Sequence, residues 1–156
     1  MLTLDEAAAF VTAAKARGQR VVFTNGVFDL LHPGHVRYLQ TARSLGDVLI
    51  VGVNSDRSVR ENKGPSRPIM PERERAEVLE ALSVVDAAVV FDEPTPQVII
   101  DRLRPDVLVK GADWAADAIV GRETVEAGGG KVVRVPIEQG WSTSAIILKA
   151  KATPDR

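Results

Sequence analysis

The chain's two histidines, His32 and His35, lie three positions apart and enclose Pro33 and Gly34. A glycine lets the backbone come close to a ligand, and the N-terminus of a helix offers unpaired N–H groups to an anion. Two imidazoles at such a place can donate hydrogen bonds to phosphate oxygens as charge develops on them. The spacing therefore predicts a phosphate-binding turn. Surface histidines or a zinc site are weaker interpretations, the latter because catalytic zinc uses three protein ligands and the chain has no further histidine and no cysteine.

The residues just before this turn lie at the end of a predicted strand. Thr24, Asn25, Gly26 and Phe28 are expected to shape the turn beside the phosphates. Phe28 would serve equally well in the core. Asp29 is interpreted as a residue that holds the turn through hydrogen bonds, with no need of a ligand contact.

A basic stretch between residues 57 and 75 carries six basic and three acidic side chains, a balance of +3. It is either a solvated segment with ordinary surface ion pairs or a mobile lid that brings cations to a triphosphate. Lys63, which precedes Gly64 and Pro65, is the preferred candidate for a moving charge. The six basic residues are Arg57, Arg60, Lys63, Arg67, Arg73 and Arg75.

Two further groups of polar residues follow predicted strands. Gly111 would allow close backbone approach, and Asp113 could accept hydrogen bonds from ribose hydroxyls, although a tight turn is the alternative. Ser142 and Thr143 lie at the start of a predicted helix, where they could cap the helix and also bind phosphate. Trp114 and Trp141 could stack on a base or a sugar, or pack within the protein.

The elements that must position these residues alternate regularly between strand and helix. Continuous apolar runs are typical of strands covered on both faces, and the alternation predicts an α/β fold with a doubly wound, Rossmann-like parallel five-stranded sheet. Ligands bind such sheets beyond the carboxyl ends of the strands. Strands are predicted over 20–24, 48–53, 87–91, 106–110 and 132–135. Helices are predicted over 4–17, 36–45, 71–82, 96–103 (capped by Thr95), 123–127 and 143–151, with a loop after 54–56.

Composition limits the class of protein. The chain has 156 residues, is 45% hydrophobic and 26% charged, and has a net charge of −1. These values favour a soluble globular protein and argue against nucleic-acid binding as the main activity. No apolar run approaches the ~20 residues of a membrane span, and the acidic N-terminus does not resemble a signal peptide, so a cytoplasmic location is expected. One domain is predicted over 1–156, with an N-terminal helix (1–19), a catalytic core (20–151) and a tail (152–156).

The absence of several well-known sequence motifs narrows the possible class of enzyme. There is no Walker A sequence, no G-x-G-x-x-G after the first strand and no G-x-S-x-G elbow. Instead, Thr24-Asn25-Gly26-x-Phe28-Asp29 followed by His32-Pro33-Gly34-His35 resembles the signature of the cytidylyltransferase-like nucleotidyltransferases. Segments 53–56, 63–68, 108–113 and 140–143 are similar to the members that convert D-glycero-β-D-manno-heptose 1-phosphate to ADP-heptose. The resemblance covers about residues 20–149.

One segment departs from the pattern of a related subgroup. The glycerol phosphate cytidylyltransferases carry an arginine where residues 137–144 read Ile-Glu-Gln-Gly-Trp-Ser-Thr-Ser, which argues against that substrate and nucleotide. The heptose-specific activity is fused to a sugar kinase in many bacteria, and the chain is expected to be a stand-alone form.

The resemblance implies an adenylyltransferase (an enzyme of EC class 2.7.7) that moves AMP from ATP to the sugar 1-phosphate and releases pyrophosphate. It implies catalytic roles for His32, His35, Lys63 and Arg75, the last as a ligand of the triphosphate. Nucleotide binding is expected from Thr24, Asn25, Gly26, Phe28, Gly34, Gly111, Asp113, Ser142 and Thr143. Mg²⁺ is expected to arrive with ATP and not in a protein-ligated site.

Other partners and activities are also expected or left open. The family implies a homodimer and a place in lipopolysaccharide biosynthesis, with no nucleic-acid or membrane partner. The open alternatives are transfer to glycerol 3-phosphate, ethanolamine phosphate or flavin mononucleotide, and a nucleotide sensor without turnover.

Overall fold

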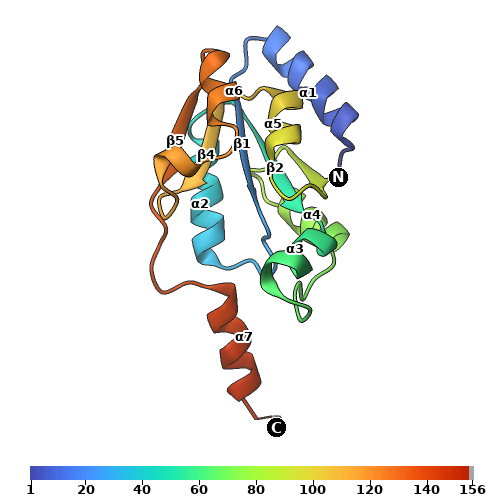
Figure 1. Ribbon diagram of the computed structural model, residues 1–156, viewed down its shortest axis with the longest axis vertical. Coiled ribbons are helices and arrows are strands. Elements are labelled where there is room, and N and C mark those ends of the chain that lie inside the picture. The colour runs from blue at the N-terminus through green and yellow to red at the C-terminus, as the bar shows by residue number, and fades with distance from the viewer. Residues whose placement is uncertain (155–156) are drawn as a thin grey trace.

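Five parallel strands form one sheet in the computed structural model, which describes residues 1–154, and their order is β3-β2-β1-β4-β5 (Figure 1). This confirms the predicted doubly wound α/β fold. The strands are β1 (Val21–Gly26), β2 (Val48–Asn54), β3 (Ala87–Phe91), β4 (Val107–Gly111) and β5 (Lys131–Val135). The helices are α1 (Leu4–Ala16), α2 (Pro33–Arg43), α3 (Asp56–Lys63), α4 (Glu72–Glu80), α5 (Gln97–Leu103), α6 (Arg122–Ala127) and α7 (Thr143–Ala152), with a 3₁₀ turn at Ala116–Ala118. Residues 155 and 156 of the predicted tail lie outside the described residues.

Alternate residues of each strand contribute to two hydrophobic cores, one on each face of the sheet. Val21 and Phe23 of β1 pack in the core formed with α1, α5 and α6, whereas Val22 packs in the core formed with α2 and α4. Successive side chains of a strand point to opposite faces, so an apolar run supplies both cores at once. The sheet is therefore covered on both sides, as the apolar runs predict.

β1 and β4 separate toward their carboxyl ends. Their pairing is Val22 with Val107 and Phe23 with Leu108, although β1 continues to Gly26 and β4 to Gly111. β1 instead pairs with β2 along its whole length. The chain runs from β1 to β2 on one side and crosses to β4 on the other, so the gap between β1 and β4 is the topological switch point. Sheets of this kind bind ligands there.

Helix α3 was not predicted, since a loop was expected after residues 54–56. Its N-cap is Ser55, whose hydroxyl accepts a hydrogen bond from the Ser58 N–H at 3.1 Å. Only Ser58 and Val59 of α3 are buried. The helix thus has no apolar stripe, which is the periodic signal that sequence prediction relies on.

Three helix starts also differ from the prediction. The cap predicted at Thr95 is wrong, because α5 is capped at Pro96 without a side-chain hydrogen bond. Pro71, predicted in the first turn of the helix, is instead the N-cap of α4, which begins one residue later at Glu72. α2 begins at Pro33 instead of Val36, because His32 caps it.

The C-terminal helix α7 projects away from the sheet and its covering helices (Figure 1). Ser142 caps it as predicted, its hydroxyl accepting from the Ala145 N–H at 3.1 Å, and none of its residues is buried. Among the helices of residues 1–154, none combines the length and the apolar composition that a bilayer span requires.

Candidate functional site

A cavity of about 730 Å³ lies beyond the carboxyl ends of β1 and β4. Its walls come from the end of β1, the first turns of α2, the end of α3, the end of β4 and the start of α7. All the predicted site residues line it except Thr24 and Arg75. Those that do are Asn25, Gly26, Phe28, His32, Gly34, His35, Lys63, Gly111, Asp113, Ser142 and Thr143.

The histidine pair forms the N-terminus of α2. His32 is the N-cap residue, and its Nδ1 accepts a hydrogen bond from the His35 backbone N–H at 3.3 Å. A neutral imidazole that accepts at Nδ1 carries its proton on Nε2, which leaves Nε2–H as a donor. The two rings stack with centroids 3.7 Å apart. Helix N–H groups and imidazole donors are thus gathered at one place, the arrangement that suits a phosphate.

Both imidazoles favour the neutral form. Burial lowers the pKa of His32, and burial together with the neighbouring His32 lowers the pKa of His35 to about 4. Positive charge for an anion must therefore come from other residues lining the cavity, or from protons taken up by the histidines when the anion binds.

Two glycines of the cavity wall lie in close contact with neighbouring side chains. A Cβ at Gly34 would come within 3.0 Å of the His32 ring and of Trp141 Cβ. A Cβ at Gly111 would lie 2.6 Å from Asp113 Oδ1 and 2.8 Å from Ile137 Cδ1. A side chain at Gly34 or Gly111 would therefore push neighbouring side chains of the cavity wall out of place.

Phe28 adopts a backbone conformation that is unusual for a residue with a side chain, with φ at 49°. Such a conformation costs about 1–3 kcal/mol and persists only where its surroundings hold it. The Phe28 ring is buried and meets His35 edge-on, with ring centroids 5.3 Å apart. The strained residue thus supports the histidine pair from the side, and it serves both the cavity wall and the core.

Asp29 has the holding role that the sequence suggested. Its carboxylate is buried and accepts from Arg67 Nε at 2.7 Å and from the Ile69 and Met70 N–H groups at 2.9 Å. Burial would raise the pKa of Asp29, but the two backbone N–H groups and the guanidinium hold it below its usual value. The ionised carboxylate therefore ties the loop between α3 and α4 to the phosphate turn.

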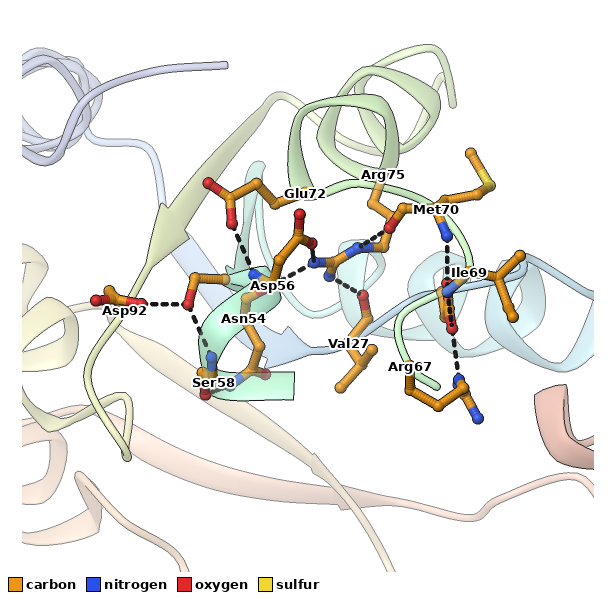
Figure 2. Close-up of polar contacts among 12 residues, drawn as sticks. Val27, Asn54, Asp56, Ser58, Arg67, Ile69, Met70, Glu72, Arg75 and Asp92 are labelled. Atoms are coloured by element: carbon orange, nitrogen blue, oxygen red, sulfur yellow. Dashed lines mark hydrogen bonds and ion pairs between the residues drawn. The ribbon is translucent and has the colours of Figure 1, made fainter. Parts of the chain in front are cut away.

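Arg75 does not reach the cavity, contrary to prediction. It is 1% exposed, and Figure 2 shows its guanidinium enclosed by acceptors. Four of its five N–H groups donate within the protein, since Nε bonds Met70 O, Nη1 bonds Val27 O, and Nη2 bonds both Asn54 O and Asp56 Oδ1. Only one N–H group of this guanidinium is left to donate to a triphosphate. Its geometry is that of a residue that positions the turn and the loop.

The family assignment follows from comparison with known proteins. A family model described as cytidylyltransferase-like matches residues 23–152. The chain belongs to the cytidylyltransferase-like family. The Bifunctional protein HldE of Geobacter sulfurreducens is 56% identical over 94% of this chain, and that of Syntrophotalea carbinolica is 57% identical over 85%.

These likenesses cover only part of the longer relatives. The chain spans 30% and 27% of the length of those two HldE proteins. A crystal structure of the lipopolysaccharide core biosynthesis protein from Thermoplasma volcanium matches with a TM-score of 0.63 and 34% identity, over 78% of this chain and 98% of that one. This cytidylyltransferase-like chain therefore resembles one part of a bifunctional protein and nearly the whole of a shorter one.

Thr24, the other predicted residue outside the cavity, lies behind the wall of this cytidylyltransferase-like site. Its hydroxyl donates to Val109 O at 2.9 Å and lies 2.8 Å from the Tyr38 hydroxyl. The Thr24 hydroxyl has one proton and donates it to the carbonyl of Val109, so the Tyr38 hydroxyl must be the donor to Thr24 Oγ1. Thr24 thus links β1, β4 and α2 and is predicted to act by holding the wall in place.

Lys110 is a cation that sequence reasoning did not select. It is the penultimate residue of β4 and lines the cavity, and its Nζ lies 5.2 Å from the centroid of the Trp114 ring. Burial lowers its pKa to about 8, against an opposing effect of Asp113. The sequence predicts that Lys110 lies at the end of a strand, but it does not predict that the Lys110 side chain lines the cavity.

The rim of the cavity is closed by contacts between α2 and the segment before α7. Arg37 pairs with Glu138, and the Trp141 ring lies nearly parallel to His32 with centroids 6.1 Å apart. Trp114 and Trp141 are both about half-exposed at the cavity. Both therefore have aromatic surface that a flat ligand could cover.

Acid should destabilise the folded chain partly through His35. The unfolded state binds a proton near pH 6.5, whereas the folded state does so only near pH 4. The stability from this group is therefore complete above pH 6.5 and is lost as the pH falls toward 4. We expect about 1–2 kcal/mol less unfolding free energy at pH 5 than at pH 7 from this source. Urea unfolding at both pH values should show a smaller loss for His35→Asn; an unchanged difference would contradict the assignment.

Proposed function

We propose that this chain transfers AMP from Mg–ATP to D-glycero-D-manno-heptose 1-phosphate, yielding ADP-heptose and pyrophosphate. The observation that carries the proposal is the stacked pair His32 and His35 at the N-terminus of α2, placed at the switch-point cavity of a cytidylyltransferase-like chain. The choice of acceptor draws on the HldE relatives and on the solved lipopolysaccharide core biosynthesis protein.

The reaction needs alignment and charge neutralisation more than acid–base chemistry. A phosphate oxygen of the sugar attacks the α-phosphorus of ATP, the bond between the α-phosphorus and the bridging oxygen breaks, and pyrophosphate leaves. The attacking oxygen is already anionic, so no covalent intermediate or strong base is required. The N–H groups of α2 and the two imidazoles would stabilise the charge that grows on the phosphates.

The remaining cavity residues have complementary roles in this proposal. Lys63 and Lys110 supply positive charge, while Ser142 and Thr143 offer hydroxyls and N–H groups at the start of α7. Asp113 would accept from the ribose hydroxyls. Asn25, Gly26 and Phe28 line the cavity together with Gly34 and Gly111, and the glycines would let the nucleotide approach the backbone.

Mg²⁺ belongs to the nucleotide substrate in this scheme, because Mg²⁺ commonly keeps water and phosphate oxygens as ligands. In residues 1–154, no three histidine, aspartate or glutamate side chains are grouped closely enough to hold a metal ion. We further propose a cytoplasmic homodimer whose product serves lipopolysaccharide assembly.

Lys63→Ala tests the cation at the end of α3. Lys63 is exposed, lines the cavity and has no ion-pair partner among the described residues, so its loss should cost little thermal stability. We expect turnover to fall about 10-fold, as for loss of a charged hydrogen bond. Arg60→Ala is the matched control, since Arg60 is exposed on the same helix and does not line the cavity. Equal turnover in both variants would remove Lys63 from the site.

Pyrophosphate release tests the function itself. ATP and CTP are each combined with heptose 1-phosphate, glycerol 3-phosphate, ethanolamine phosphate and flavin mononucleotide in the presence of Mg²⁺. Release with ATP and heptose 1-phosphate alone is the expected result. Release with another pair would replace the substrate assignment. A folded protein that binds ATP and releases no pyrophosphate with any acceptor would instead be a sensor.

A further inference from the structure

We propose that Arg67 is the arginine that binds the nucleotide's phosphates, the role that the sequence had suggested for Arg75. The inference rests on the proposed function, since it concerns the same cavity and the same phosphates. It makes Arg67 a catalytic residue and makes Asp29 and Arg75 the residues that position it.

Arg67 lies in the loop between α3 and α4 and lines the cavity. Its side chain is only 13% exposed, and its Nε donates to Asp29 Oδ2 at 2.7 Å. The Ile69 and Met70 N–H groups donate to the same carboxylate as Arg67, and Figure 2 shows these three residues close together on the loop. The guanidinium is thus held through one edge by a buried anion.

The other edge of the guanidinium has no such partner. The hydrogen bonds found within residues 1–154 involve Arg67 Nε and leave the two terminal nitrogens of the guanidinium without a protein acceptor. Four N–H groups in a fixed fork match two phosphate oxygens. Arg37, the other arginine lining the cavity, already pairs with Glu138. Arg67 is therefore the arginine of the cavity that is both oriented and available.

Asp29 connects the loop that carries Arg67 to the turn that carries the histidine pair. It lies three residues before His32 in the phosphate turn and accepts from the loop that carries Arg67. Arg75 braces the same two segments from the other side, through Val27 O at 2.7 Å and Met70 O at 2.9 Å. Donors from two distant parts of the chain are thereby held in one arrangement before a nucleotide arrives, which is the condition for strong electrostatic stabilisation.

The experiment compares Arg67→Ala, Arg67→Lys and the control Arg73→Ala. Arg73 is exposed on α4 and does not line the cavity. Pyrophosphate release, Mg–ATP binding by calorimetry and thermal midpoints are measured for each. We expect turnover to fall about 100-fold in Arg67→Ala and at least about 10-fold in Arg67→Lys, because lysine keeps the charge but not the fork. Mg–ATP should bind about 10-fold more weakly, and Arg73→Ala should stay within twofold of the parent.

A double variant tests the coupling with Asp29. If Asp29 acts through Arg67, Asp29→Asn should lower turnover in the parent and have little further effect in Arg67→Ala. Additive losses would overturn the positioning role. Folded Arg67→Ala with turnover and Mg–ATP affinity within threefold of the parent would overturn the proposal as a whole. If the parent transfers nothing to heptose 1-phosphate, the proposed function fails, while the Mg–ATP titration still decides the role of Arg67.

Discussion

His35→Ala should lower turnover by about 10²–10³-fold, the cost of removing a preorganised donor from a developing oxyanion. The His35 ring stacks on His32 and meets Phe28, so it is held in place without a ligand. Its Nδ1 is buried and takes part in none of the hydrogen bonds found within residues 1–154. A buried polar atom without a hydrogen-bond partner lowers the stability of the fold, and such atoms are often found where a protein binds or reacts with a ligand. Under the proposed function, the His35 imidazole would donate a hydrogen bond to a phosphate oxygen when the substrate binds.

The loss in His35→Ala should not be a loss of fold. The hydrogen bonds found within residues 1–154 include none from the His35 side chain, so its removal mainly costs packing against Phe28 and His32. Gln40→Ala provides a control on the same helix, because Gln40 is exposed and outside the cavity. Steady-state pyrophosphate release and thermal midpoints are compared. Near-normal turnover in a folded His35→Ala protein would exclude His35 from the catalytic set.

Lys110→Met should lower kcat/KM for ATP by about 100-fold at pH 7, because a partly buried cation in the phosphate cavity is lost while the aliphatic length is kept. Lys110 lies against the Trp114 ring in the absence of an anion, and a cation–π contact is weaker than a charged hydrogen bond to phosphate. The ammonium should therefore leave Trp114 for the nucleotide when it binds.

The pH dependence separates the charge of Lys110 from its bulk. The pKa of Lys110 is lowered to about 8, so the free protein loses this charge as the pH rises through 8. We expect kcat/KM to decline above pH 8 in the parent, because kcat/KM reports ionisations of the free enzyme. Lys110→Arg should keep activity and lose this alkaline decline, since arginine stays charged. An unchanged decline in Lys110→Arg would assign it to another group.

Local features of the sequence predicted much of the fold. The five strands begin and end within two residues of their predicted bounds. A short continuous apolar run that ends at a turn is typical of a strand covered on both faces, which is the kind of strand a doubly wound sheet contains. The cap at Ser142 was also predictable, since it depends on one hydroxyl and a backbone N–H three residues away. The histidine turn brings its own donors together within four residues.

The same reasoning fails where a contact joins distant residues. Asp29 and Arg67 are 38 positions apart, and Arg75 and Val27 are 48 apart. Nothing in the local pattern distinguishes an arginine that reaches the cavity from one buried behind it. α3 was missed for a related reason, because it is stabilised by its Ser55 cap and by tertiary contacts instead of an apolar stripe.

The sequence by itself therefore determined the five strands and the place of the turn that carries the two histidines. Each of these depends on interactions among neighbouring residues: the period of apolar side chains, the caps, and the glycine at a close approach. The tertiary structure alone decided which cations serve the cavity. The guanidinium of Arg75 donates to carbonyl oxygens of three separate segments. The side chain of Arg67 is oriented by the carboxylate of Asp29 and lines the cavity. Lys110 lines the cavity at the point where β1 and β4 separate.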